Sequence, residues 1–265
     1  MQKRVLFSAS LFHALNDAAS VTVPMIFPLL YSQKFIITHY SHIGILSNLG
    51  LLVTFLCQIF IVNLSHRVEY KHLLLLSIGG ITLFLLLLPF SSMFTTLLFF
   101  YLLLRIFTSF YHPIGIAWVS KTHPDQGLDF AMGLQSGSGN VGVLLAFLSS
   151  GYLAQAYSWT GPLKIWAATV LFFGAISFLS VRKTSTKSRD RLSHDFSSWI
   201  EIIKKLKVYI LGLAFGGACW GTTVFYAPSL LNHKFHVPLG KTGASLALWI
   251  GIGSVMTYLF GYLSR

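Results

Sequence analysis

Residues 5–31 read VLFSASLFHALNDAASVTVPMIFPLLY, and this stretch decides the class of fold. It is longer than the ~20 apolar residues that span a bilayer as a helix, yet Asp17 lies near its middle. A charge at the bilayer centre costs about 2.5–3.5 kcal/mol on insertion scales, so it is kept mainly where it faces a water-filled path, an ion site or a partner charge. Arg105 lies in the same way near the middle of a second apolar run, residues 93–119. These two charges are therefore the first candidates for functional residues.

The composition is typical of a membrane protein. Of the 265 residues, 54% are hydrophobic and 10% are charged, and the mean hydropathy is +0.70, whereas a soluble domain carries about 25% charged residues. The formal net charge of +12 does not indicate nucleic-acid binding, because the basic residues lie in short gaps between apolar runs. Cys57 and Cys219 fall within apolar runs, which predicts small buried thiols rather than a disulfide.

Apolar windows predict an all-α, polytopic membrane protein with about eight transmembrane helices. Lys3 and Arg4 ahead of the first run imitate a signal peptide, but the run is long enough to be a retained helix. Prolines inside such helices are tolerated when neighbouring groups satisfy the freed carbonyls. The predicted helices are residues 5–31, 43–64, 73–90, 93–119, 129–156, 162–181, 208–231 and 242–264.

The distribution of basic residues predicts the orientation. With a cytoplasmic N-terminus, 14 of the 19 Lys and Arg residues fall in cytoplasmic segments, four fall in outer segments, and Arg105 lies within a span. The positive-inside rule therefore predicts a multi-pass protein of the plasma membrane with its N-terminus in the cytoplasm. The cytoplasmic set is Lys3, Arg4, Arg67, Lys71, Lys121, Arg182, Lys183, Lys187, Arg189, Arg191, Lys204, Lys205, Lys207 and Arg265, and the outer set is Lys34, Lys164, Lys234 and Lys241.

The chain repeats itself at a spacing of about 200 residues. PLLYSQKF at 28–35 matches PSLLNHKF at 228–235, and Gly44 then matches Gly243 after one residue is lost from the loop. Six predicted helices separate the two copies, so both copies have the same orientation in the membrane. This pattern indicates a parallel repeat of a six-helix half.

The repeat divides the chain into three parts. Residues 1–181 form a six-helix N-terminal half, residues 182–207 form a cytoplasmic linker, and residues 208–265 form the first two helices of a second half. The end of the linker is predicted to be an amphipathic helix at the membrane surface. Its apolar face would consist of Trp199, Ile200, Ile203 and Leu206.

This organisation resembles the major facilitator superfamily, whose members are secondary transporters of 12 helices in two halves. Three short motifs resemble the fosmidomycin-resistance-type exporters of that superfamily. HALND at 13–17 is similar to their H-x-x-N-D, FYHP at 110–113 to their His-Pro, and GNVG at 139–142 to their Gly-Asn-x-Gly. The resemblance covers the whole chain and implies a protein that is incomplete at its C-terminus, since four further helices would be expected.

The loop after the second predicted helix departs from the superfamily pattern G-x-x-x-D-R-x-G-R-R. Residues 62–71 read VNLSHRVEYK, in which His66 stands where the acid is expected and Arg67 is kept. The resemblance implies that Arg67 contributes to gating, and the departure places that role in question.

His13 and Asp17 are four residues apart and share a helix face, with Asn16 beside them. A carboxylate in this position is typical of a proton-coupling or cation-coupling site. The alternative interpretation is a structural polar contact with another helix.

Arg105 and His112 are the second pair of candidates. Arg105 remains charged and needs a partner or an anionic substrate, and His112 follows about 10 Å further along the helix. The resemblance implies proton relay or recognition of substrate charge. A static ion pair of Arg105 with Asp17, and a conformational role for His112 beside Pro113, are the alternatives.

The segment GSGNVG at 137–142 matches the dinucleotide fingerprint G-x-G-x-x-G, but no strand precedes it, so we reject a nucleotide site. Gly137, Gly139, Asn140 and Gly142 instead predict close helix packing. The resemblance implies contact between this helix and the eighth, across the two halves. Trp220 and Tyr226 are weaker candidates for residues lining a cavity.

We expect no cofactor and no metal ion. His39 with His42 and His233 with His236 form two H-x-x-H pairs in predicted outer loops, and we interpret them as surface histidines. The chain offers no nucleophile–base constellation and no phosphate-binding loop, so an enzyme is not expected.

The resulting hypothesis is a secondary active transporter that exports a small organic molecule or drug in exchange for protons. Its partners would be the substrate, protons, membrane lipids and a further C-terminal half, with no nucleic acid. Two alternatives remain. One is proton-symport uptake of a small organic solute, and the other is a non-transporting membrane remnant or a subunit that depends on a partner chain.

Overall fold

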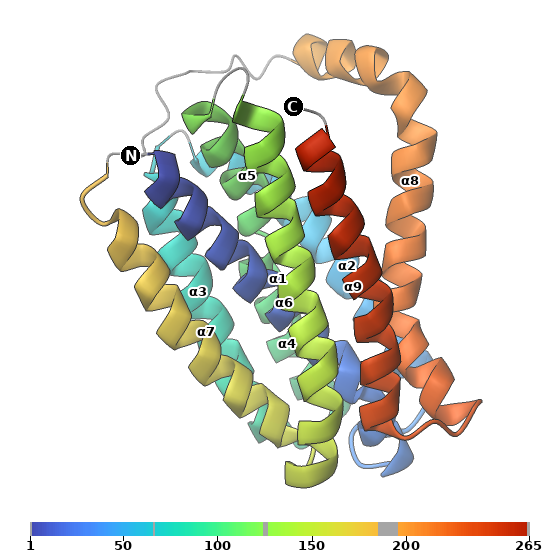
Figure 1. Ribbon diagram of the computed structural model, residues 1–265. Helices are drawn as coiled ribbons and strands as arrows, with labels where there is room; N and C mark the ends of the chain where they lie inside the picture. The colour runs from blue at the N-terminus through green and yellow to red at the C-terminus, as the bar shows by residue number, and fades with distance from the viewer. Residues whose placement is uncertain (1, 66, 124–126, 185–195, 264–265) are drawn as a thin grey trace.

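A computed structural model describes residues 2–65, 67–123, 127–184 and 196–263. The described residues form a bundle of long α-helices (Figure 1), which confirms the predicted all-α fold. His66, Lys187, Arg189, Arg191 and Arg265 from the sequence analysis lie outside the described residues. The elements are α1 Gln2–Ser32, α2 Tyr40–Leu64, α3 Tyr70–Leu87, the short η1 Leu88–Phe90, α4 Phe94–Thr108, α5 Tyr111–Thr122, α6 Leu128–Tyr157, α7 Thr160–Val181, α8 Phe196–His233 and α9 Leu239–Leu263.

Six helical stretches of the described chain are long and apolar enough to cross a membrane, and a bent pair within α8 makes a seventh if it counts as one span. The six are Tyr40–Leu64, Tyr70–Phe90, Phe94–Thr122, Leu128–Tyr157, Thr160–Val181 and Leu239–Phe260. The helix α1 is not among them, since its middle carries polar side chains, although it is 31 residues long. The count of about eight spans therefore remains a prediction for α1 and α8.

The fourth predicted span consists of two helices, α4 and α5, with a break at Ser109 and Phe110. The cause is Pro113, because a proline has no N–H for the carbonyl four residues earlier, and its ring clashes with that carbonyl. That carbonyl belongs to Ser109. The backbone tightens at the break, where the N–H of Phe110 bonds to the carbonyl of Phe107 at 3.4 Å.

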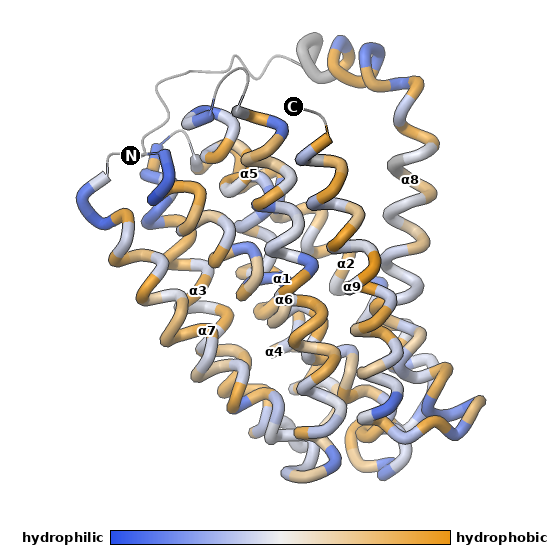
Figure 2. The backbone as a smooth tube through the Cα atoms, in the orientation of Figure 1, coloured by the Kyte–Doolittle hydropathy of each residue, from blue (hydrophilic) through white to orange (hydrophobic). Residues whose placement is uncertain are grey.

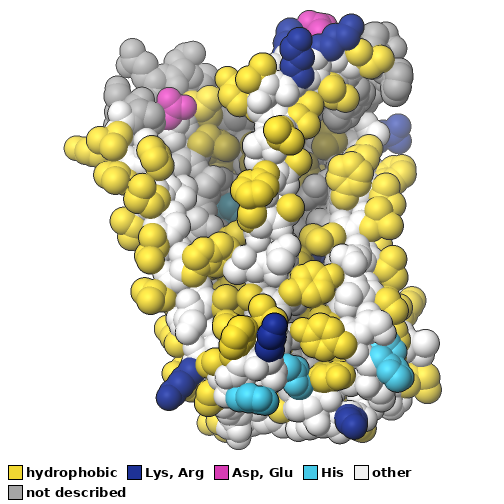
Figure 3. All heavy atoms as spheres, turned by 90° about the vertical axis from the view of Figure 1, so that its right-hand side faces the viewer, with side chains coloured by type: hydrophobic (Ala, Val, Ile, Leu, Met, Phe, Trp, Pro, Cys, Tyr) yellow, Lys and Arg dark blue, Asp and Glu magenta, His cyan; other side chains and the backbone are white. Residues whose placement is uncertain are grey.

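The surface of the bundle is apolar over its middle. Large hydrophobic side chains such as Phe60, Phe172 and Leu211 are more than half exposed. Hydrophilic residues gather toward the two ends of the tube in Figure 2, and Figure 3 shows Lys, Arg and His side chains at the top and bottom of one face with hydrophobic side chains between them. This belt suits a lipid environment. Both cysteines are free; Cys57 is half-buried, whereas Cys219 is exposed, so its predicted burial is wrong.

The centre of the bundle is α1, which packs most extensively against α6 and α7, while α6 also packs along the whole of α9. The helix α8 lies at the edge of the bundle and bends by 50° between Ile200–Gly212 and Ala214–His233, as Figure 1 shows at its upper right. The predicted amphipathic segment is thus the first part of α8 rather than a separate helix. Its Ile200, Ile203 and Leu206 side chains are exposed.

The α1–α2 and α8–α9 hairpins turn at the same end of the molecule, at the bottom right of Figure 1. Their turns touch, since the ring of His233 packs edge-on against Tyr31 at 4.6 Å between centroids and approaches the carbonyl of Pro28 at 3.3 Å. The parallel arrangement agrees with the repeat found in the sequence.

Candidate functional site

Three titratable side chains meet in the middle of the bundle. His13 and Asp17 lie one turn apart on α1, and the His13 Nε2 atom is 3.0 Å from the Asp17 Oδ2 atom. His112, from the first turn of α5, brings its Nε2 atom to 3.4 Å from the other carboxylate oxygen. The Asp17 side chain is 16% exposed and that of His13 is 8% exposed. His13 and Asp17 are therefore largely shielded from solvent, whereas the side chain of His112 is 41% exposed, and the two imidazoles flank the carboxyl group of Asp17.

Asn16 contributes to the same cluster by donating its Nδ2 hydrogen to Asp17 Oδ1 at 3.0 Å. Its own side-chain oxygen is buried and has no hydrogen-bond partner among the described residues. A buried carbonyl oxygen without a donor is costly.

A second layer fixes the orientation of His13. Its Nδ1 atom lies 2.8 Å from the carbonyl of Gln135 on α6, and its ring stacks on Tyr111 with centroids 4.4 Å apart. Gln135 donates to the Tyr111 hydroxyl at 2.7 Å, and that hydroxyl donates to the carbonyl of Ala9 at 2.8 Å. The contact to the Gln135 carbonyl makes Nδ1 a donor. Nε2 then accepts from the Asp17 carboxyl group when that group is protonated, and donates to the carboxylate when the imidazole carries both protons.

Arg105 on α4 is buried but does not pair with Asp17 in the described structure. Its Nε donates to the Thr54 hydroxyl at 3.0 Å and approaches the carbonyl of Gly50 at 3.4 Å, both on α2. The guanidinium also lies over the ring of Phe225 on α8, 5.5 Å from the centroid. The alternative of a static Arg105–Asp17 ion pair is therefore wrong for this conformation. The Thr54 hydroxyl, the Gly50 carbonyl and the aromatic face of Phe225 stabilise the guanidinium instead.

Asp17, His112 and Arg105 line one cavity of about 160 Å³. Trp220 and Phe225 of α8 close its opposite wall, so the cavity lies between the two copies of the repeat. Of the two weaker sequence candidates, Trp220 lines the cavity, whereas Tyr226 does not and instead donates to Asn48 on α2 at 3.2 Å. A volume of 160 Å³ is below the about 300 Å³ of a typical ligand pocket. In this conformation the cavity beside the charges is therefore smaller than a typical ligand pocket.

The small residues of α6 bring its backbone close to α1 and α9. A Cβ at Gly142 would collide with the carbonyl of Ala14, and one at Gly139 would lie 2.6 Å from the His13 ring and 2.9 Å from Asp17 Oδ2. A Cβ at Gly137 would lie 2.5 Å from the ring of Tyr258 on α9.

Asn140 on the same helix donates to the Thr257 hydroxyl of α9 at 3.3 Å. Gly139 thus leaves the room that His13 and Asp17 occupy, while Gly137 and Asn140 join α6 to α9. Arg67 lies apart from all of these residues, exposed in the turn between α2 and α3.

Sequence reasoning missed several residues of the site. Thr54, Gln135 and Tyr111 hold the charged groups, and Phe225 covers Arg105. Gln135 was detectable as an amide inside an apolar run, and Tyr111 as the neighbour of His112. Thr54 and Phe225 gave no local signal, because they come from helices far away in the sequence.

The same cluster is where a cation would fit best. One ligand atom each of His13, Asp17 and His112 lie within 4.8 Å of one another, the one group of this kind among the described residues. The H-x-x-H pairs do not form such a group. His42 stacks on Phe94 at 3.9 Å between centroids, and His233 packs on Tyr31, so these two are half-buried packing residues rather than surface histidines.

Comparisons with known proteins agree with this architecture. The sequence model described as Major Facilitator Superfamily matches residues 6–265. A search of curated protein sequences finds no match to this chain. Among solved structures, 43 chains match, including two crystal structures of a bacterial homologue of the human lysosomal transporter Spinster in inward-facing conformations.

The unoccupied Spinster homologue superimposes with a TM-score of 0.78 at 16% sequence identity, over 99% of this chain and 62% of that chain. The occupied form gives a TM-score of 0.74 at 18% identity, over 98% and 60% of the two chains. At these identities the likeness shows the fold alone. The chain spans about three fifths of the length of these relatives.

Proposed function

The chain belongs to the major facilitator superfamily, and on that premise we propose that it is a secondary transporter in which the Asp17 cluster couples proton movement to transport of a small organic molecule. The observation that carries the proposal is the buried carboxylate of Asp17 held between His13 and His112 at the edge of a cavity. Membrane-embedded ionisable groups that face a cavity mark ion and proton pathways. Transport rather than catalysis is the activity of this superfamily.

The proposed cycle alternates the proton occupancy of this cluster. When the cavity opens to one side, water reaches the carboxylate and a proton binds to the Asp17–His pair. When it opens to the other side, the proton leaves. His112 is the member of the cluster that moves with α5, and His13 is fixed by Gln135 and Tyr111. His13 therefore sets the geometry of the acceptor, and His112 relays the proton or senses the substrate.

The proposed substrate carries a negative charge or a strong dipole. Arg105 presents a cation to the cavity beside the aromatic walls of Trp220 and Phe225, and a guanidinium recognises carboxylate and phosphonate groups through paired hydrogen bonds. We infer export by antiport as the direction, in line with the fosmidomycin-type motifs at 13–17 and 110–113. Symport uptake is the alternative that the same charges would serve.

The proposed setting is the plasma membrane with the N-terminus in the cytoplasm. The domain boundaries remain those expected from the repeat, with residues 1–181 as one half, 182–207 as the linker and 208–265 as part of a second half. The complete transport path is proposed to include a larger second half, in keeping with the greater length of the matched structures. A partner-dependent or non-transporting role remains the competing proposal.

The test uses fosmidomycin, a phosphonate anion, as the probe. Cells that express the chain are compared with cells that express Asp17→Asn, and growth inhibition is measured with and without a protonophore. Asp129→Asn is the matched control, because Asp129 is an exposed carboxylate in the first turn of α6, outside the site. We expect the wild type and the control to raise the inhibitory concentration, and Asp17→Asn to lower that gain about tenfold or more, since contacts to charged groups are worth about 1.5–3 kcal/mol.

Each other outcome has a distinct meaning. If the wild type makes cells more sensitive and Asp17→Asn reverses this, the direction is uptake. If Asp17→Asn keeps full, protonophore-sensitive transport, the proton-coupling role of the cluster is wrong. If neither protein changes growth or drives proton flux in vesicles with any anionic probe, the non-transporting alternative gains support.

A further inference from the structure

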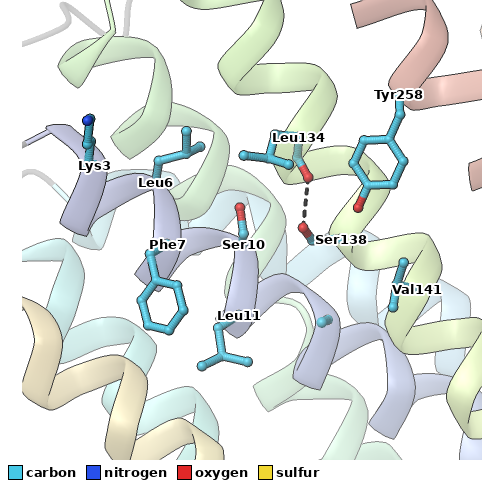
Figure 4. A pocket seen from close by; sticks show the side chains of 10 residues that line it. Lys3, Leu6, Phe7, Ser10, Leu11, Leu134, Ser138, Val141 and Tyr258 are labelled. Atoms are coloured by element: carbon cyan, nitrogen blue, oxygen red, sulfur yellow. Dashed lines mark hydrogen bonds between the residues drawn. The ribbon is translucent and has the colours of Figure 1, made fainter.

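A second and larger cavity lies on the outside of the bundle, away from the charged site. It has a volume of about 510 Å³ and is bounded by the N-terminal half of α1, by α6 and by α9. The side chains of Leu6, Phe7 and Leu11 form its apolar wall on α1, and Phe7 is 53% exposed, so this groove opens to the surroundings of the bundle (Figure 4). Its volume falls in the about 300–1,000 Å³ range of ligand sites.

The groove has the depth of one membrane leaflet. Its lining on α1 runs from Lys3 to Ala14, which is about 16 Å along a helix that rises 1.5 Å per residue. The hydrocarbon core of a bilayer is about 30 Å thick, so half of it is about 15 Å. With the proposed cytoplasmic N-terminus, the groove would begin at the membrane surface and end near the bilayer centre, beside the turn that carries Asp17.

Polar groups lie at defined depths in this apolar groove. Lys3 stands at its mouth, exposed, with no carboxylate within ion-pairing distance in the part of the chain that the structure describes. The Oγ atom of Ser10 is buried and lacks a hydrogen-bond partner among the described residues. In Figure 4 the hydroxyl groups of Ser10 and Tyr258 point into the space between α1 and α9. Lys3 thus offers a cationic donor at the mouth of the groove, Ser10 and Tyr258 offer hydroxyl groups deeper inside, and apolar side chains line most of the rest.

We propose that this groove binds one anionic phospholipid of the leaflet at the N-terminal end of α1. The phosphate contacts Lys3, a glycerol or ester oxygen accepts from Ser10, and one acyl chain lies along Phe7, Leu11 and Val141. The charge complementarity selects an anionic headgroup, because basic side chains near the surface of an anionic membrane each add attraction, whereas a zwitterionic lipid gains little. The single-leaflet depth matches the length of one lipid molecule.

The bound lipid would touch the element that carries the coupling site. Ala14 lies at the deep end of the groove, its backbone packs directly on Gly142, and it separates His13 from the lipid. A lipid that fills the groove therefore stabilises the packing of α1 against α6 in the conformation described here. The occupant is distinct from the transported molecule, which the proposed function places in the other cavity.

The experiment measures lipid retention by native mass spectrometry. The full chain is reconstituted in vesicles of equimolar phosphatidylglycerol and phosphatidylcholine, extracted, and weighed with its bound lipids. We expect one retained phosphatidylglycerol per protein. Lys3→Gln should lower the ratio of retained phosphatidylglycerol to phosphatidylcholine about fivefold. Val141→Trp, which fills the slot with an indole, should abolish retention of both.

Two matched variants control for general effects. Lys164→Gln removes an exposed lysine at the other end of the bundle, and Leu148→Trp adds an indole to an exposed, lipid-facing position of the same helix as Val141. Both should retain the lipid as the wild type does, and helical circular dichroism verifies that every variant is folded. Equal retention of the two lipids by the wild type, or equal loss in Val141→Trp and Leu148→Trp, overturns the proposal. Retention that persists in both Lys3→Gln and Val141→Trp also overturns it.

Discussion

Arg105 shows how a membrane protein holds a permanent cation without an adjacent carboxylate. Its described partners are the Thr54 hydroxyl, the Gly50 carbonyl and the face of Phe225, which come from two other helices. Each of these partners is neutral, so the cation keeps its full charge toward the cavity. An anion that enters the cavity could therefore form an ion pair with the guanidinium of Arg105.

We therefore predict that Arg105→Lys weakens transport, although the substitution keeps the positive charge. A lysine ammonium lacks the planar fork that donates to Thr54 while stacking on Phe225. We expect at least about tenfold weaker transport of an anionic probe, measured in vesicles. Thr54→Val is the control, since it removes one hydrogen bond worth about 1 kcal/mol and leaves the charge in place. If Arg105→Lys transports the probe as well as Thr54→Val does, the planar shape of the guanidinium is not required and the prediction is wrong.

The sequence predicted contacts within one helix better than contacts between helices. The spacing of four placed His13 and Asp17 on one face, and the structure brings them to 3.0 Å. For Arg105 the sequence offered a static pair with Asp17 only as an alternative, from their similar depth in two predicted spans, and no pattern in the chain points to Thr54. Helix periodicity fixes neighbours along one element, whereas a neighbour across elements depends on helix rotation, which a single sequence does not reveal.

At the scale of elements, the seam between α1 and α6 is the closest packing around the site. Gly142 lies against the backbone of Ala14. Because the contact is with main-chain atoms, no flexible side chain could move aside for an added methyl group. The sequence indicated this packing through its small residues. It also suggested a single helix at 93–119, although Pro113 was visible, because membrane helices often absorb a proline without breaking.

Gly142→Ala is predicted to destabilise the protein and to weaken transport together. The added methyl group must push α1 away from α6, and overpacking of this kind costs about 1–3 kcal/mol. Thermal unfolding in detergent measures the effect. Gly253→Ala on α9 is the control, since nothing lies within 4 Å of a Cβ built there. Equal melting temperatures for the two variants would contradict the close contact.

A second prediction at this scale concerns the end of α7. The Lys71 ammonium, at the start of α3, donates to the carbonyls of Arg182 and Thr184 at 3.0 and 2.7 Å and pairs with Glu69 at 2.9 Å. Lys71→Met leaves those carbonyls and the carboxylate without that donor, at a cost of about 1–3 kcal/mol. We expect a lower melting temperature, and no change for Lys164→Met, whose lysine is exposed. An unchanged melting temperature for Lys71→Met would show that the α3–α7 contact is dispensable.

At the scale of the whole molecule, the two hairpins that turn at one end define the topology. The sequence repeat predicted their parallel orientation, and the contact between His233 and Tyr31 brings the two turns together. The sequence predicted a surface segment followed by a span from residue 208, but not that one helix, α8, carries both with a 50° bend between Gly212 and Ala214.

This topology makes a prediction about sidedness. In a background with Cys57→Ser and Cys219→Ser, single cysteines at Lys34 and Lys234 should react with a membrane-impermeant maleimide from outside intact cells. Single cysteines at Lys121 and Lys183 should react only after the cells are opened. These two residues lie at the ends of α5 and α7, at the opposite end of the bundle from the α1–α2 and α8–α9 turns. Labelling of Lys34 and Lys234 from opposite sides would refute the parallel repeat, and reversed labelling of all four would refute the cytoplasmic N-terminus.

The break between α4 and α5 has a mechanical consequence. Arg105 stands on one side of the break and His112 on the other, and no main-chain hydrogen bond from Pro113 ties the two segments together. A small swing of α5 would therefore carry the imidazole of His112 away from Asp17 while the guanidinium stays on Thr54. The distance between Arg105 and His112 on one candidate span therefore depends on the backbone at Ser109 and Phe110 rather than on one continuous helix.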